Sequence, residues 1–416
     1  MSTARFQDYL ESWRLHLERT PFIVLFLVLG TLAFAYWNRK VRLAILPFQP
    51  TNTRQTATSR HESSSSGQAS GSMRGYPPIT PLPNFTWQTT NPLVFRPFKP
   101  KYHLTMALSN LSVSELIPMD KTYKERMALR AALLAQYRDV VLGVHDEDDP
   151  RIRRAVAELY TFILGTYLPT RYPSMFSLSA SADKNNRTRS VENKVTGKTC
   201  PVEMDAGQPV IKGLEILGQT VDEDFLVLLP EKTETDTGKG KENEERYFLA
   251  AYTTYFPSGF DTRAKLGLRL AAIHDPVPGY QEKLERSMDR FFARVEVGRF
   301  VSRVNWSVTT ETGLFAAFGG VHGSAAGGGQ IEPGMLDVDS TVLRCERQTL
   351  HRLPRSKALV FAFHTYTYPL RSIKEEGLGE ELATAIDGLK AGNVPGMHWY
   401  KRGSVWGEAV KHFLRS

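Results

Sequence analysis

The fold is decided by the stretch 341-TVLRCERQTLHRLPRSKALVFAFHTYTY-368, near the end of the chain. Along its first part, residues 341–350, the side chains follow an alternating pattern, in which every second residue would lie on the same face of a strand. Its second part, residues 358–368, is rich in aromatic and β-branched residues. Both features are typical of β-strands. The stretch therefore predicts two consecutive strands of a sheet.

Further strands and helices are predicted upstream of this pair. Runs of apolar and aromatic residues predict strands at residues 224–229, 247–256 and 300–308. Apolar residues at helical spacing predict helices at residues 121–141, 151–166 and 280–295. Polar or glycine-rich composition predicts loops at residues 181–200, 231–245 and 319–329. Five strands with helices packed on one face form an α+β fold, compatible with a PAS-like antiparallel sheet with flanking helices.

The N-terminal part of the chain has the features of a membrane anchor. Residues 20–38 carry no charge, and a helix of that length reaches about 28 Å, close to the hydrocarbon thickness of a bilayer. We expect a single transmembrane helix there, within an N-terminal segment of residues 1–46. The basic cluster Arg39, Lys40 and Arg42 follows the span and favours a cytosolic location for the rest of the chain.

A change in composition separates this anchor from the folded part of the chain. Residues 47–83 are rich in Ser and Pro and have little apolar surface to offset the entropy of ordering, so they predict a flexible linker. A folded domain is therefore expected at residues 84–416, with its core at about residues 210–370.

Composition and motifs exclude several classes of protein. Two cysteines, Cys200 and Cys345, are too few for a disulfide framework or a four-cysteine metal site. The motifs H-E-x-x-H, G-x-S-x-G and C-x-x-C do not occur, which argues against metalloproteases, α/β-hydrolases and thioredoxins. The net charge of +8 is spread along the chain without a dense basic stripe, so no nucleic-acid partner is expected.

His274 is the first candidate for chemistry. It lies directly before the turn Asp275-Pro276-Val277-Pro278, where two prolines fix the backbone. A rigid position suits a metal-ligating or catalytic imidazole, and Asp275 could hold the second ring nitrogen. A buried histidine that is bonded to backbone carbonyls is the alternative interpretation.

Glu346 is the second candidate, because a strand at residues 341–350 would turn it, with Arg344 and Gln348, to the face opposite Arg347. A buried carboxylate needs a cationic partner. A protonated amine could supply that charge, and so could a structural salt bridge to Arg344, Arg303 or Arg352.

Three motifs together resemble a known family. They are FRPFKP at residues 95–100, IHDPVPGY at 273–280, and ERQTL at 346–350 followed by RLP at 352–354. This pattern resembles the alpha-subunit family of haem-dependent oxidative N-demethylases. The resemblance implies a PAS-like sheet that binds haem b and a monooxygenase that demethylates a small secondary amine with oxygen. It also implies electrons from NADPH through a separate flavin and iron–sulfur reductase, because the chain lacks ferredoxin cysteines and a G-x-G-x-x-G fingerprint.

The same resemblance suggests roles for individual residues. It makes His274 the candidate proximal ligand of the haem iron and Glu346 the candidate binding group for the amine. Arg347, Gln348 and Arg352 become candidates for contacts with the haem propionates or the pocket. His103, Tyr102 and His351 are the reserve candidates for the iron ligand.

Two other classes of function remain open at this point. A haem-PAS sensor, or a haem-binding protein without catalytic activity, would share the fold and need a partner for its output. A type II membrane glycosyltransferase would share the layout of anchor, stem and domain, and acidic pairs at residues 337–339 and 222–224 offer D-x-D patterns. Such pairs are a weak signal, because acidic residues often cluster in loops.

Overall fold

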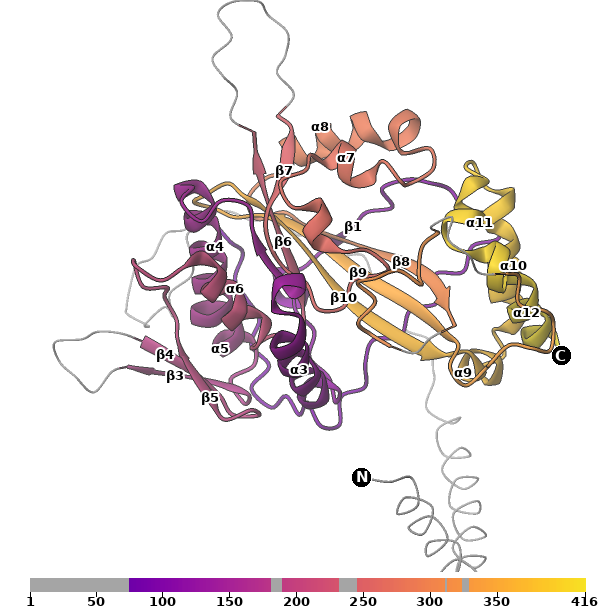
Figure 1. Ribbon diagram of the computed structural model, residues 1–416. Coiled ribbons are helices and arrows are strands. Elements are labelled where there is room, and N and C mark those ends of the chain that lie inside the picture. Colours follow the sequence, from indigo (N-terminus) through magenta and orange to yellow (C-terminus); the bar gives the residue numbers. More distant parts are fainter. Residues whose placement is uncertain (1–74, 181–188, 232–244, 311–312, 324–328) are drawn as a thin grey trace, which may run out of the picture. The chain divides into compact units, whose positions relative to one another are not determined.

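The computed structural model describes residues 75–180, 189–231, 245–310, 313–323 and 329–416, which all belong to one folded unit (Figure 1). The predicted membrane span and most of the predicted linker lie outside these ranges. No helix within the described ranges is both long enough and apolar enough to cross a bilayer. The last residues of the predicted linker are described, and among them Tyr76 is buried against Phe162 and Phe300, with ring centroids 4.6 and 5.2 Å away.

The centre of the unit is an antiparallel sheet of seven strands that contains all five predicted strands. Two short strands, β1 and β2, form its edges. In spatial order the strands are β1 (Ser109–Leu111), β8 (Phe300–Thr309), β9 (Val342–Arg352), β10 (Leu359–Pro369), β6 (Asp224–Pro230), β7 (Tyr247–Thr253) and β2 (Leu142–Val144). Helices pack around this antiparallel sheet, which confirms the predicted α+β class.

The two strands predicted at residues 341–350 and 358–368 form the hairpin β9–β10. The two strands pair without interruption from Val342 opposite Pro369 to Arg352 opposite Leu359. Glu158 ties the turn to the helix beside it, because its carboxylate accepts hydrogen bonds from the backbone N–H groups of residues 355 and 356, both at 2.7 Å. The hairpin is therefore fixed at the turn as well as along its ladder.

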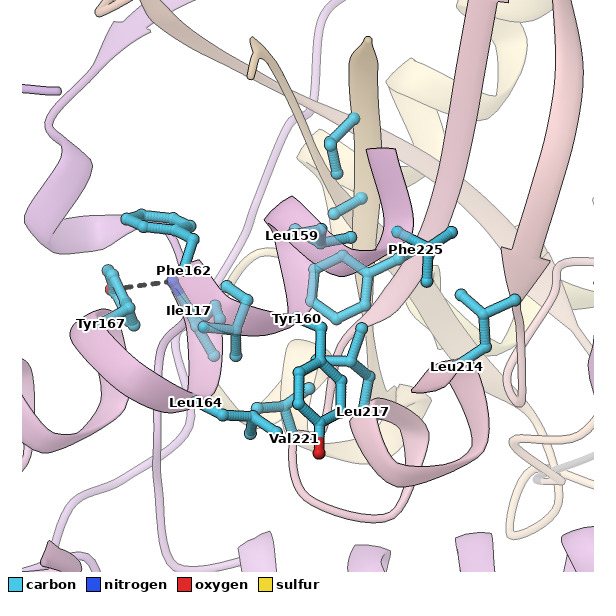
Figure 2. Packing of buried hydrophobic residues seen from close by; sticks show 14 of the residues in the cluster. Ile117, Leu159, Tyr160, Phe162, Leu164, Tyr167, Leu214, Leu217, Val221 and Phe225 are labelled. Atoms are coloured by element: carbon cyan, nitrogen blue, oxygen red, sulfur yellow. Dashed lines mark hydrogen bonds between the residues drawn. The ribbon is translucent and has the colours of Figure 1, made fainter. Parts of the chain in front are cut away.

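One face of the sheet is covered by helices from the first half of the chain. They are α3 (Tyr123–Val141), α4 (Pro150–Phe162), the π-helical turn Ile163–Tyr167, α5 (Leu168–Arg171) and α6 (Val210–Gly218). Both helices predicted in this region are present. Figure 2 shows Leu159 and Tyr160 of α4 beside Phe225 of β6 and Leu217 of α6, whereas Phe162 lies beside Tyr167. These side chains form the largest apolar cluster of the described residues.

Helices also cover the opposite face, so the expectation that they pack on one face only is wrong. Alternate residues of β10 show this: Val360 and Ala362 join the cluster of α4 and α6, whereas Leu359 packs with Leu284 and Met288. β7 is buried along its whole length, which requires cover on both sides.

The helices of this second group come from the second half of the chain. Next to the sheet lie α7 (Leu270–His274), the π-helical turn Gln281–Glu285 and α8 (Arg286–Arg294), and the last two together account for the helix predicted at residues 280–295. The chain ends in α9 (Leu370–Glu375), α10 (Gly379–Ala391), α11 (Gly396–Tyr400) and α12 (Gly403–Arg415). In Figure 1, α7 and α8 lie beside β7, and the C-terminal helices gather at the other end of the long strands.

A small second sheet corrects the prediction of a loop at residues 181–200. β3 (Phe176–Ala180), β4 (Arg189–Asn193) and β5 (Lys198–Pro201) form three antiparallel strands. Their sequences contain many polar residues, because much of this sheet is exposed, and so the apolar pattern of a strand is missing. Of the loops predicted at residues 231–245 and 319–329, residues 232–244 and 324–328 lie outside the described residues, and the described residues of both segments form no helix or strand.

Candidate active site

A cavity of about 250 Å³ lies against the sheet face that α7 and α8 cover. Strands β8, β9 and β10 form its floor, and α7, α8 and α11 contribute to its walls. Most of the lining is aliphatic or aromatic, including Leu284, Met288, Phe292, Val301 and Leu350. A mostly apolar cavity with a few converging polar groups is the usual form of a small-molecule site.

Strand register brings the polar groups of the floor together. Asn305 of β8 lies opposite Glu346 of β9, and Arg303 lies opposite Gln348. All four side chains line the cavity. They share one face because they occupy alternate positions of paired strands, as the sequence predicted for Glu346 and Gln348.

Glu346 is buried, with 5% of its surface exposed, and its carboxylate is only half satisfied. Oε2 accepts a hydrogen bond of 2.9 Å from the Gln348 amide. Oε1 is buried and has no hydrogen-bond partner among the described residues. Buried polar atoms are rarely left without a partner, so this oxygen is a candidate contact for a ligand.

The structural salt bridge that the sequence left open for Glu346 does not form with any described residue. Arg344 donates to the backbone carbonyls of Phe256, Pro257 and Leu314. Arg303 remains near enough to act through its charge, since Glu346 raises the pKa of Arg303 against the larger lowering by burial.

His274 is the last residue of α7, and its ring lines the cavity. Nδ1 lies 2.8 Å from the Leu270 carbonyl oxygen; a carbonyl only accepts, so Nδ1 carries the proton and donates it. The ring of Tyr280 stacks on the imidazole, with centroids 4.8 Å apart and planes 12° from parallel. The carbonyl of Leu270 therefore takes the role that the sequence suggested for Asp275.

The protonation state of His274 leaves Nε2 available. Burial lowers the pKa of His274 to about 4, against the opposing effect of the Leu270 hydrogen bond. The ring is therefore neutral at physiological pH, and Nε2 has a free lone pair. No described residue donates a hydrogen bond to it. The alternative of a histidine satisfied by backbone carbonyls is thus realised at one nitrogen only.

Lys401 and His322 belong to the cavity, although the sequence does not predict them. Lys401 Nζ donates to Asn305 Oδ1 at 2.9 Å and to the Trp306 carbonyl, and burial lowers its pKa to about 7. The His322 ring stacks on Tyr400 at 4.7 Å, and burial lowers its pKa to about 3. Neither residue lies in a motif, so only the folded chain could bring them to β9.

Two arginines proposed from the resemblance do not line the cavity. Arg347 lies on the other sheet face and donates to the Leu116 carbonyl at 3.2 Å. Arg352 donates to the carbonyls of Val295 and Phe292, at 2.7 and 2.6 Å. Backbone groups occupy both guanidinium groups, so neither arginine belongs to the proposed site. Gln348 does line the cavity.

The reserve candidates for an iron ligand are dispersed. Tyr102 lines the cavity, whereas His103 is exposed and His351 is buried on the opposite face of the sheet. Asp222 and Asp224, one of the two D-x-D pairs, are buried and paired with Arg126 and Arg130. The D-x-D pattern at residues 222–224 is therefore part of a buried ion-pair cluster.

One comparison with known proteins bears on this site. A family model described as "haem-dependent oxidative N-demethylase, alpha subunit-like" matches residues 107–411, well over half of the chain. The matched region includes His274, Arg303, Glu346 and Lys401, and with them both the floor and the helical walls of the cavity.

Proposed function

The chain belongs to the haem-dependent oxidative N-demethylase, alpha subunit-like family, and on that premise we propose that it is a monooxygenase-type oxidoreductase that demethylates a small secondary amine. The observation that carries the proposal is the pairing, in one cavity, of a neutral imidazole with a free Nε2 and a buried carboxylate with a free oxygen. Fold alone would not support a specific activity, so the argument depends on these two side chains.

The residues around the cavity fit a haem. His274 would hold the haem iron through Nε2, and the carbonyl of Leu270 fixes the ring tautomer as ligating histidines require. Leu284, Met288 and Phe292 offer apolar surface for the macrocycle. A haem b held by this histidine would supply oxygen-activating chemistry.

Glu346 would bind the amine. Its Oε1 would accept a charge-assisted hydrogen bond from the ammonium group, which is roughly twice as strong as a neutral one. Gln348 would hold the carboxylate in place, because its amide already donates to Oε2. This contact fixes the amine nitrogen, and with it the orientation of the N-methyl group. Oxidation of that methyl group by one molecule of oxygen, with two electrons and two protons, would release formaldehyde, the shorter amine and one molecule of water.

The remaining parts of the proposal concern partners and location. Electrons would come from NADPH through a separate flavin and iron–sulfur reductase. Residues 20–38 would anchor the chain as a single-pass membrane protein, with the folded unit on the cytosolic side. The PAS-like description of the sheet belongs to the same family-based proposal.

An absorption spectrum of the purified full-length chain, combined with titration of dimethylamine, tests the proposed function. Wild type should take up haem and show a Soret band that responds to the amine. His274→Ala should lose most of this band, whereas His103→Ala, which changes an exposed histidine, should keep it. Glu346→Gln should keep the band but lose about ten- to a hundredfold in amine affinity, the value of a hydrogen bond to a buried charge.

Each possible failure has a distinct meaning. A Soret band that responds to no amine would favour a haem sensor. If the protein does not bind haem, the redox proposal is wrong and the glycosyltransferase alternative is favoured. An unchanged band in His274→Ala would exclude this residue as the ligand, and Tyr102 would become the next candidate.

A further inference from the structure

Arg303 is a third cavity residue with unused hydrogen-bonding capacity, after Glu346 and His274. Its Nε is buried without a partner, and its guanidinium group forms no hydrogen bond or salt bridge with any described residue. The other two cations near Glu346 are occupied, because Arg344 and Lys401 donate to backbone carbonyls. A partly buried guanidinium group that is left unpaired costs free energy, and a bound anion would recover it.

Glu346 and Arg303 carry opposite charges but do not form a salt bridge with each other. They are diagonal neighbours on adjacent strands, since Arg303 lies opposite Gln348, two residues beyond Glu346. Diagonal neighbours lie about 7–8 Å apart, and no salt bridge joins the two side chains. Each therefore presents a charged group to the same cavity, with opposite signs on neighbouring strands.

The basic side chains around Glu346 disfavour binding of an amine that carries a positive charge and no negative charge. Glu346 raises the pKa of Arg303, Arg344 and Lys401 against the larger effect of burial, so three basic side chains sense its single negative charge. A simple ammonium ion would be attracted by Glu346 but repelled by Arg303. A molecule that carries its own carboxylate would cancel this repulsion and fill the unused donors of the guanidinium group.

We propose that the substrate is a zwitterionic N-methyl amino acid, whose ammonium group binds Glu346 and whose carboxylate binds Arg303. This inference rests on the proposed function and names its substrate class. Arginine suits the role because its planar fork can hold a carboxylate through two parallel hydrogen bonds. The carboxylate has one other source, a haem propionate, and the experiment separates the two.

Calorimetric titration of the haem-loaded, full-length protein tests the proposal with a matched pair of probes. N-methylglycine carries both charges, and its primary amide has the same shape but only the cation. Wild type should bind N-methylglycine about ten- to a hundredfold more tightly than the amide, as expected for one charge-assisted contact. Arg303→Gln should bring this ratio near one, because N-methylglycine loses its contact while the cationic amide is freed from repulsion and binds at least as tightly as before. Its haem content should stay unchanged.

Glu346→Gln is the matched control for the other charge. It should lower the affinity for both probes by a similar factor and leave the ratio of the two affinities unchanged, because both probes carry the ammonium group. Arg303→Lys should give an intermediate ratio, since an ammonium group keeps the charge but loses the fork. This variant also preserves the test if Arg303→Gln does not fold.

Three results would overturn the inference. A ratio near one in wild type, with amine binding intact, would refute the zwitterion and leave the proposed function standing. Loss of haem from Arg303→Gln with the ratio preserved would assign Arg303 to a propionate. Wild type that binds haem but neither probe would overturn both the inference and the proposed amine chemistry.

Discussion

His351 is a buried histidine that no described residue hydrogen-bonds at either ring nitrogen. It stacks on Phe300 at 5.0 Å and meets Tyr76 edge-on at 5.8 Å. Burial lowers its pKa to about 3. The folded protein thus keeps this ring neutral at a pH where the unfolded chain, with a pKa near 6.5, binds a proton. Stability that is complete above about pH 6.5 is therefore lost as the pH falls toward 3.

The first prediction concerns His351→Phe. Wild type should lose about 1.4 kcal/mol of unfolding free energy per pH unit below 6.5 through this histidine alone. The phenylalanine ring cannot be protonated, so between pH 7.5 and 5 the variant should lose about 2 kcal/mol less than wild type. Urea unfolding at the two pH values measures the difference.

An exposed histidine provides the control for this measurement. His103→Gln should follow wild type at both pH values, because His103 is exposed. His274 and His322 remain in the variant, and burial lowers the pKa of both, so some acid sensitivity should persist. Equal losses in His351→Phe and wild type would contradict the assigned cause.

At the scale of elements, α8 is held to the sheet by Arg352. The guanidinium group forms no salt bridge with a described carboxylate. It donates to the carbonyls of Phe292 and Val295, near and just after the end of α8, and to Tyr247 of β7 at 3.0 Å. The last carbonyls of a helix lack partners within the helix, and arginine supplies them here. Because Leu284 and Met288 lie on the same helical segment and line the cavity, this contact also positions a cavity wall.

The second prediction is that Arg352→Met destabilises the protein by about 3 kcal/mol, because several buried carbonyls lose their donor. Arg352→Lys should recover little, since a lysine lacks the planar fork that reaches several acceptors. Thermal unfolding measures both. Arg355→Met, which changes an exposed arginine three residues away, should stay within about 0.5 kcal/mol of wild type. A small effect of Arg352→Met would show that α8 is held mainly by apolar packing.

The long strands can be predicted because their sequences show strand patterns over many residues. β9 and β10 are of this kind, and their alternation alone is enough to place Glu346 and Gln348 on one face of the sheet. The strands β4 and β5 escape prediction because they are short and rich in polar residues. Short strands of this kind follow from tertiary pairing, and local sequence does not reveal them.

The site is predictable only in part, for a related reason. His274 stands out through the prolines beside it and Glu346 through its place on a strand. Lys401 and His322 reach the cavity from connections distant in sequence, and no periodicity marks such residues. Arg347 and Arg352 share the motif of Glu346, yet Arg347 faces away from the cavity and backbone carbonyls bind both guanidinium groups. Sharing a motif with Glu346 is therefore not enough to place these two arginines in the cavity.

At the scale of the whole molecule, the folded unit begins before the predicted boundary at residue 84. The backbone of Thr80 bonds to Ser114 Oγ at 2.8 Å and accepts from Arg171 at 2.6 Å. Tyr76 fills a space between Phe162 and Phe300. These contacts join residues 75–83 to the helices that cover the sheet. A truncated protein should therefore keep residues 75–83.

The third prediction compares deletion of residues 1–74 with deletion of residues 1–83. Both lack the proposed anchor at residues 20–38, so neither should sediment with membranes. The shorter deletion keeps the contacts of Tyr76 and should unfold like the full chain and take up haem. The longer one removes a buried aromatic ring and should lose about 3 kcal/mol or more, as aromatic truncations in cores do. Tyr76→Ala in the full chain should reproduce most of that loss. Membrane binding by the shorter deletion would contradict the anchor, and equal stability of the two deletions would show that residues 75–83 do not contribute to the core.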